Sequence, residues 1–484
     1  MWKIIWEIRL RNGRDTIQRV QRLGNCNCIQ GTSVHAAMGN RDIKYYIYIK
    51  EIQMSGRSHH RYVLRNQRQP VLQQGDVFTR PVVENLVEIL DNKQVATLCH
   101  LSREFRSLTI DILNDRLLER LNKGKTFYNN INIFEIRIPD GLVNLWESTF
   151  YECTNLATII LPKSLTSIGK TAFANCHSLR AIDLPSSVTT IGAKAFINCE
   201  SLNFITWPPS MMKIEERCFR QCTRLTNINL RMTKVTRIEL AAFSGCIALT
   251  KVTLPNSLQM IDTMAFEGCT TLSEIGPFTE KFKSIGHDVF KKCNALKRIN
   301  LQRSTLMTSM DAGAFAYSSG LQEIILPSSV TAIESKTFYG CTSLTNINLS
   351  MTKVERIERA AFSGCVALTT VTLPTSLRTI NTMAFENCTA LINIGPFTNK
   401  FTSFLHGCTD NCIVFAYNVF NNCIALQEID LHNTSIDRCM RSDTFGACPN
   451  LQSIILPNIL SNCDHRFIGC PRATVGEVTD LYGP

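Results

Sequence analysis

Hydrophobic residues recur along most of this chain at intervals of 23 to 25 residues, with one longer interval between Phe385 and Phe420. Each period contains a phenylalanine, and a cysteine follows three residues later in every period except the one with Ser318. In the first thirteen periods a leucine lies three residues after this position, and an isoleucine or valine lies six after it. Fourteen phenylalanines carry the pattern: Phe150, Phe173, Phe196, Phe219, Phe243, Phe266, Phe290, Phe315, Phe338, Phe362, Phe385, Phe420, Phe445 and Phe467.

The end of each period predicts a short β-strand with one buried face, because its last apolar residues are two apart, as in Ile182 and Leu184. The Pro-x-Ser that often follows predicts a turn. We expect each period to form one coil of strand, turn, return strand and short helical turn. Such a coil cannot close a core alone, so it must stack on its neighbours. The sequence predicts an α+β repeat solenoid of about fourteen coils over residues 126–472, followed by a tail at 473–484.

Two segments of the repeat, LPSSVTTIGAKAFINCESL at 184–202 and LPSSVTAIESKTFYGCTSL at 326–344, are similar to the BspA-like leucine-rich repeat family. The resemblance covers about residues 145–472. It implies a solenoid lined by strands and a role in binding or adhesion.

A block of the solenoid is duplicated. Residues 222–279 and 341–398 align without gaps at an offset of 119 residues, and 44 of the 58 positions are identical. The offset equals five coil lengths, so the copy keeps the stacking register and lengthens the solenoid. This indicates that surface length is the property under selection.

The strand positions beside the buried isoleucine or valine are expected to face outward, since side chains alternate along a strand. They are polar, mixed in charge and poor in aromatic residues. This composition favours a protein or glycan partner held by many hydrogen bonds. The predicted contact residues are Phe204, Asn227, Asn229, Arg298, Asn346 and Asn348.

The repeat accounts for 13 of the 21 cysteines. Neighbouring coils bring these cysteines close together, but their side chains point in the same direction, which does not suit a disulfide. We expect buried free thiols that behave as small hydrophobic residues, as in a reducing compartment. A thiol column that binds a soft metal is the alternative.

The long interval before Phe420 contains an insertion near LHGCTDNCIVF. His406, Cys408, Asp410 and Cys412 lie within seven residues, which makes His406, Cys408 and Cys412 candidate zinc ligands. A plain solvent-exposed loop and a loop that contacts a partner are the other interpretations.

The hydrophobic period changes to three and four residues between Asp76 and Leu121, which predicts two or three amphipathic helices in residues 76–125. The pattern P-x-x-E-x-L-x-x-I-L, followed by further apolar positions, resembles an F-box. That resemblance implies docking on a Skp-type adaptor of a cullin ubiquitin ligase. A helical cap that shields the first coil is the alternative. The implied contact residues are Pro81, Glu84, Leu86, Ile89, Leu90, Leu98, Leu101 and Phe105.

Positive charge is concentrated at the amino-terminal end. Residues 1–75 contain 13 Lys or Arg against 4 Asp or Glu, which leaves a net charge of only +2 for the rest of the +11 chain. A nearly neutral body argues against a nucleic-acid partner, because such a groove needs clustered cations. We expect residues 1–75 to be a basic, partly disordered arm.

The sequence predicts no catalytic, cofactor or membrane function. Gly124, Lys125 and Thr126 lack the glycine five residues earlier that a phosphate-binding loop needs, since Glu119 stands there. No G-x-S-x-G or H-E-x-x-H motif occurs, and no stretch of 18 apolar residues or signal-peptide core is present. We therefore expect a non-enzymatic protein in the cytoplasm or nucleus.

Two functions fit these features. In the first, the solenoid binds a protein target and residues 76–121 recruit a ubiquitin ligase, so that the protein is a substrate adaptor. In the second, the repeats alone form a surface or host-contact adhesin.

Overall fold

The computed structural model describes residues 6–11, 32–39 and 42–47, then 119–457 except 120, 122, 125, 132, 139, 406–415 and 437–442, and finally 474–476. The chain divides into two compact units, Met1–Arg116 and Leu117–Pro484. Residues 76–118 of the predicted helical segment lie outside the described residues, together with its expected contact residues Pro81, Glu84, Leu86, Ile89, Leu90, Leu98, Leu101 and Phe105.

The first unit contains a three-stranded sheet. Strand β1 (Trp6–Arg11) pairs in parallel with β2 (Thr32–Gly39), which pairs antiparallel with β3 (Asp42–Ile47). These strands occupy part of the segment for which the sequence predicts a basic, partly disordered arm. The other residues of that arm lie outside the described part of the chain.

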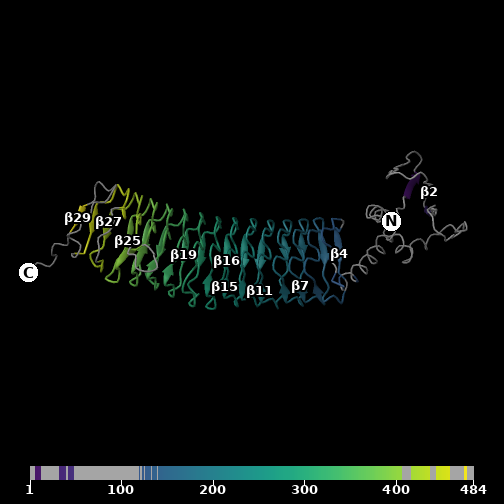
Figure 1. Cartoon of the computed structure of the whole chain (residues 1–484), viewed down its shortest axis with the longest axis horizontal. Helices are drawn as coiled ribbons and strands as arrows, with labels where there is room; N and C mark the ends of the chain where they lie inside the picture. Colours follow the sequence, from purple (N-terminus) through teal and green to yellow (C-terminus); the bar gives the residue numbers. More distant parts are fainter. Residues whose placement is uncertain are drawn as a thin grey trace, which may run out of the picture. The chain divides into compact units, whose positions relative to one another are not determined.

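The second unit is a parallel β-solenoid of about 13 turns. Its strands lie in two rows. Figure 1 shows successive strands stacked along the solenoid from β4 onward. The first row consists of β4 (Glu135–Arg137), β6 (Thr158–Ile160), β8 (Ala181–Ile182), β10 (Phe204–Ile205), β12 (Asn227–Asn229), β14 (Lys251–Thr253), β16 (Glu274–Gly276), β18 (Arg298–Asn300), β19 (Glu323–Ile325), β21 (Asn346–Asn348), β23 (Thr370–Thr372), β25 (Asn393–Gly395), β27 (Glu428–Asp430), β28 (Ser453–Ile455) and β29 (Thr474–Gly476).

The second row contains the return strands, which also pair in parallel. Met310 takes the place of a strand between β17 and β20, through a bridge to Ile285. The return strands are β5 (Asn144–Leu145), β7 (Ser167–Ile168), β9 (Thr190–Ile191), β11 (Lys213–Ile214), β13 (Arg237–Ile238), β15 (Met260–Ile261), β17 (Ser284–Ile285), β20 (Ala332–Ile333), β22 (Arg356–Ile357), β24 (Thr379–Asn381) and β26 (Ser403–Leu405).

The structure corrects the predicted α+β class to an all-β solenoid. Among the described residues, helical conformation occurs only at Glu119 and Leu121. In place of the expected helical turn, the segment around each phenylalanine forms non-helical turns with left-handed residues on both sides, such as Thr171 (φ 51°) and Asn175 (φ 62°) around Phe173. The amide of Thr171 donates to the carbonyl of Ala193 in the next coil, and that of Ala174 donates to the carbonyl of Thr171, so bonds between coils alternate with bonds within the turn and no helix forms.

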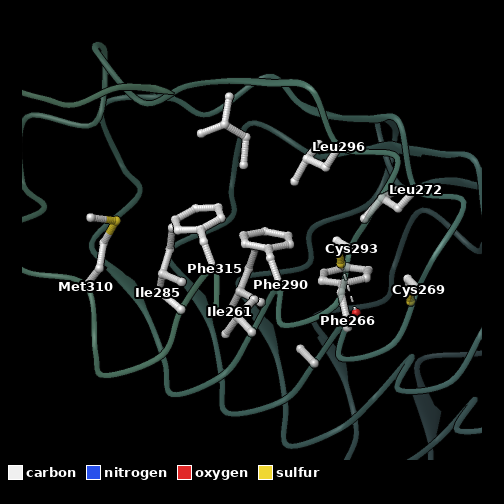
Figure 2. Packing of buried hydrophobic residues seen from close by; sticks show 14 of the residues in the cluster. Ile261, Phe266, Cys269, Leu272, Ile285, Phe290, Cys293, Leu296, Met310 and Phe315 are labelled. Atoms are coloured by element: carbon white, nitrogen blue, oxygen red, sulfur yellow. Dashed lines mark hydrogen bonds between the residues drawn. The ribbon is translucent and has the colours of Figure 1, made fainter. Parts of the chain in front are cut away.

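The predicted phenylalanine column forms the centre of the core. Thirteen of the fourteen phenylalanines lie among the described residues, and the side chain of each is fully buried. Neighbouring rings stack with their centroids 5.1–5.8 Å apart, as Figure 2 shows for Phe266, Phe290 and Phe315. Phe127 extends the column by one coil before the first predicted member, Phe150. The core is therefore continuous from coil to coil.

The cysteine column is also buried, and its thiols are free in the twelve described members. This confirms the prediction for those residues, whereas Cys470 lies outside them. Each thiol donates a hydrogen bond to the carbonyl oxygen of the phenylalanine in the preceding coil, at 3.0–3.3 Å. Figure 2 shows one such bond, from Cys293 to Phe266. The position therefore needs a small side chain that can donate.

Ser318, the one exception in the column, keeps this bond. Its hydroxyl donates to the carbonyl of Phe290 at 2.5 Å and accepts from the amide of Cys293 at 3.2 Å. We expect Ser318→Ala to lower the free energy of unfolding by about 0.5–1.5 kcal/mol, because two buried hydrogen bonds of the hydroxyl are lost while the Cys293 amide stays bonded to the Phe290 carbonyl. Ser318→Cys restores the donor and is the matched control. Denaturant unfolding measures both variants, and an alanine variant more stable than the cysteine variant would contradict this role.

Candidate binding face of the solenoid

The exposed surface of the first strand row is the candidate binding face, and we call it the outward face. In seven of these strands the middle residue is buried and the residues on either side are exposed, as in β12 and β21. Backbone groups pair between neighbouring strands, for example Asn346 with Thr370 and Asn348 with Thr372. The outward face therefore recognises a ligand through its side chains.

All six residues predicted to contact a partner lie on the outward face and are exposed. Phe204 has an exposed fraction of 55%, and it lies beside Ala181 of the neighbouring strand. Asn227 and Asn346 occupy the same register position in the two copies of the duplicated block. Their amide nitrogens donate to the exposed hydroxyls of the preceding threonines, at 3.3 and 3.2 Å, and the amide oxygen of Asn227 also accepts from the exposed hydroxyl of Thr250 at 3.4 Å. Both amides are thus accessible at the surface.

Asn229 and Asn348 have a structural role that the sequence analysis missed. The side-chain oxygen of Asn229 accepts from the amide of Arg231 at 3.1 Å, and that of Asn348 accepts from the amide of Ser350 at 3.0 Å. Such side-chain caps stabilise a turn. These coils lack the Pro-x-Ser turn, so each asparagine shapes the turn after its strand. The missing proline is the sequence signal that could have indicated this structural role.

The charged residues of the outward face pair with one another. Lys251 lies 2.6 Å from Glu274, and Arg298 lies 3.4 Å from Glu323, in each case across neighbouring strands. The side chain of Arg298 is 78% exposed, so its ion pair contributes little to stability. Arg298 can exchange this partner for a ligand carboxylate at small cost.

Two exposed isoleucines on the outward face were also missed. Ile160 is 47% exposed and Ile325 is 39% exposed, and each is the last residue of its strand. The isoleucine pairs Ile159-Ile160 and Ile324-Ile325 break the alternation of apolar and polar residues, which is a signal in the sequence. With Phe204, they place apolar contact points within a polar surface.

The candidate zinc ligands His406, Cys408 and Cys412 lie outside the described residues. Within the described part of the chain, no three His, Cys, Asp or Glu side chains form a group that could hold a metal. In the same part, none of the helical residues belongs to a segment long and apolar enough to span a bilayer.

The repeat and its stacking agree with a known family. A model of the BspA type leucine rich repeat region matches residues 123–234, 212–342, 308–415 and 408–474. The chain belongs to this family. The matches to this BspA type protein cover both copies of the duplicated block and the coil of Phe127, which the cysteine pattern alone did not include.

Solved structures of other leucine-rich repeat proteins are similar to this chain. A leucine-rich repeat protein from Bacteroides ovatus is 26% identical, with a TM-score of 0.53 over 73% of this chain and 85% of that one. A leucine rich cell surface protein from Faecalibacterium prausnitzii is 23% identical, with a TM-score of 0.38 over 72% of this chain and 88% of that one. None of the curated proteins compared with this BspA type protein matches it significantly.

Proposed function

We propose that this protein is a non-enzymatic scaffold that holds a partner protein along its outward face. The observation that carries the proposal is the duplicated block, which repeats exposed residues such as Asn227 and Asn346 at the same register. Leucine-rich repeat solenoids bury each coil against its neighbours, so added coils add binding surface without a new core.

The composition of the outward face supports a protein partner. Phe204 and Ile325 offer apolar contacts, and Asn227 and Asn346 offer hydrogen-bonding groups around them. Protein interfaces combine apolar anchors with a polar surround in this way. An extended row of such positions suits a ligand that is itself long.

The free thiols favour a site of action inside the cell. Thirteen described cysteines are buried and unpaired, twelve of them in the column and the other at Cys218. Disulfides dominate cysteine use in oxidising compartments, whereas reduced thiols persist in the cytosol and nucleus. We therefore propose an intracellular location.

The sequence of residues 76–121 supports a finer proposal, that this segment docks a Skp-type adaptor and makes the scaffold a ligase substrate receptor. The support is the F-box-like spacing of Pro81, Glu84 and Leu86, and the position of that segment ahead of the repeats. The adhesin interpretation uses the same face and does not need residues 76–121.

Affinity capture with three forms of the full chain separates these proposals. We expect Asn346→Arg to lower recovery of the solenoid partner at least about tenfold, because a bulky charge on the face displaces close contacts. Thr375→Arg is the matched control, since Thr375 is exposed on a turn beyond the outward face. Equal loss in both variants would contradict the outward face as the site.

Deletion of 76–121 tests the adaptor proposal separately. Loss of a Skp-type or cullin subunit with retention of the solenoid partner supports that proposal, and failure to recover any such subunit from the full chain rules it out. Labelling of intact cells with a membrane-impermeant amine reagent tests the adhesin: a labelled solenoid would contradict the intracellular location.

A further inference from the structure

A hollow of about 730 Å³ lies among the turns beside the phenylalanine column, away from the outward face. It is lined by the turns of five successive coils, from that of Phe290 to that of Phe385. The buried residues of its lining are small: Gly313, Ala316, Ala360 and Ser363. Gly313 has φ +70°, and a side chain there would collide with the carboxylate of Asp288. The space is therefore built into the fold.

The coils five turns earlier in the solenoid supply a comparison for this hollow, because they are in the same stacking register. At the corresponding positions, 119 residues earlier, they carry larger side chains, with Lys194 in place of Gly313 and Ile197 in place of Ala316. In those earlier coils Glu216 lies 4.0 Å from Lys194 and 2.6 Å from Arg217. The earlier turns are therefore occupied by bulky side chains that pair with one another.

The coils that line the hollow lack this pairing. Ser335 stands in place of Glu216, and Lys336, the counterpart of Arg217, has no ion-pair partner in the described part of the chain. Arg359 replaces Leu240 and likewise has no ion-pair partner among the described residues. Two exposed cations thus line the hollow without an ion pair among the described residues.

Of the two acidic residues in the lining, Asp288 forms an ion pair, whereas Glu386 has none among the described residues. Asp288 lies 3.0 Å from Lys291, which also lies 3.7 Å from Glu267. Glu386 accepts a hydrogen bond from the side chain of Asn421 at 3.2 Å. The lining thus carries three cations, Lys291, Lys336 and Arg359, against two carboxylates, and its net positive charge favours an anionic ligand.

Two tyrosines beside the cations indicate the rest of the ligand. The rings of Tyr317 and Tyr339 lie 5.2 Å apart, nearly perpendicular, and Tyr317 is 48% exposed. Exposed aromatic rings bind the apolar face of a ring-shaped ligand through contact area. The backbone here is occupied, since the amide of Lys336 donates to Arg359 and that of Tyr317 donates to Tyr339. An extended peptide, which depends on free backbone groups, is therefore disfavoured.

We propose that this hollow binds an acidic saccharide, whose carboxylate or sulfate contacts Lys336 and Arg359 and whose ring packs on Tyr317. The volume is within the range of about 300–1,000 Å³ that is usual for small-ligand sites. The hydroxyls of Ser335 and Ser363 in the lining provide partners for sugar hydroxyls. This site is separate from the outward face and does not depend on the function proposed for that face.

Titration calorimetry of the full chain tests the site with four probes: an unsulfated chondroitin tetrasaccharide, its sulfated form, neutral chitotetraose and tetraglutamate. We expect both acidic saccharides to bind more tightly than either other probe. Tighter binding of the sulfated form would identify sulfate as the main anion, and equal binding would identify the carboxylate. Absence of binding by both acidic saccharides, or equal binding of chitotetraose or tetraglutamate, would overturn the proposal.

Two variants locate the binding. We expect Lys336→Gln with Arg359→Gln to weaken binding of the acidic saccharides at least about tenfold, because two charge-assisted contacts are lost. Arg217→Gln, at the corresponding position five coils earlier, should leave binding unchanged. Ala316→Ile refills the hollow with the side chain found at Ile197 and should also weaken binding. Unchanged affinity in both the double variant and Ala316→Ile would overturn the site.

Discussion

Replacing Phe290 by alanine should lower the free energy of unfolding by about 3–5 kcal/mol. Its ring is fully buried and stacks on Phe266 at 5.8 Å and on Phe315 at 5.2 Å. The substitution removes the ring contacts to both neighbouring coils. It also leaves a cavity in the phenylalanine column. Denaturant unfolding followed by circular dichroism measures the change.

Phe204→Ala is the matched control, since it makes the same chemical change at a side chain that is 55% exposed. Surface substitutions usually change stability by no more than about 0.5 kcal/mol. Similar losses in the two variants would mean that the phenylalanine column is not the main source of stability.

Raising the pH above 9 should unfold the solenoid through its buried thiols. Burial raises the pKa of Cys246 and of Cys365 to about 12, from an ordinary value of 9.0. The folded state therefore keeps protons that the unfolded state releases, so the contribution is complete below pH 9 and is lost as pH rises toward 12. Between pH 9 and 12, each such thiol lowers the free energy of unfolding by about 1.4 kcal/mol per pH unit, and the column contains many buried thiols.

Circular dichroism across this pH range measures the transition. Cys246→Ser with Cys365→Ser is the control, because Ser318 shows that serine keeps the bond to the phenylalanine carbonyl and does not ionise in this range. The double variant should unfold at higher pH than the natural chain. An unchanged midpoint would show that other groups govern the alkaline transition.

The stacked core could be predicted from the sequence because the residues that specify it lie close together within each coil. Phe173 and Cys176 lie at fixed spacing within one coil, and the same spacing in the next coil predicts their columns. The first coil begins at Phe127, but Asn130 stands three residues later where the pattern has cysteine, so the pattern appeared to begin at Phe150.

The turns could not be predicted in the same way. Residues such as Lys194 and Met383 take left-handed φ angles of 60° and 58°, although neither residue type favours them. Hydrogen bonds to the next coil impose this conformation, as when Met383 donates to Tyr417. The predicted helical turn was wrong because these bonds form between coils and leave no local signal.

The candidate sites could likewise be predicted from the sequence only in part. The exposure of Phe204 and Asn227 followed from strand alternation, whereas the cap formed by Asn229 depends on a turn two residues later. The hollow near Gly313 depends on side chains from five coils, and only the comparison with Lys194 shows why it is open.

Site-specific photocrosslinking tests the central claim most directly. A photoreactive phenylalanine analogue is placed at Phe204 or Asn346 on the outward face, or at Thr375 on a turn, and the full chain is irradiated with its captured partner. The account predicts one saturable crosslinked species from each outward-face position and none from Thr375. Crosslinks of equal yield from Thr375, or none from either face position, would contradict it.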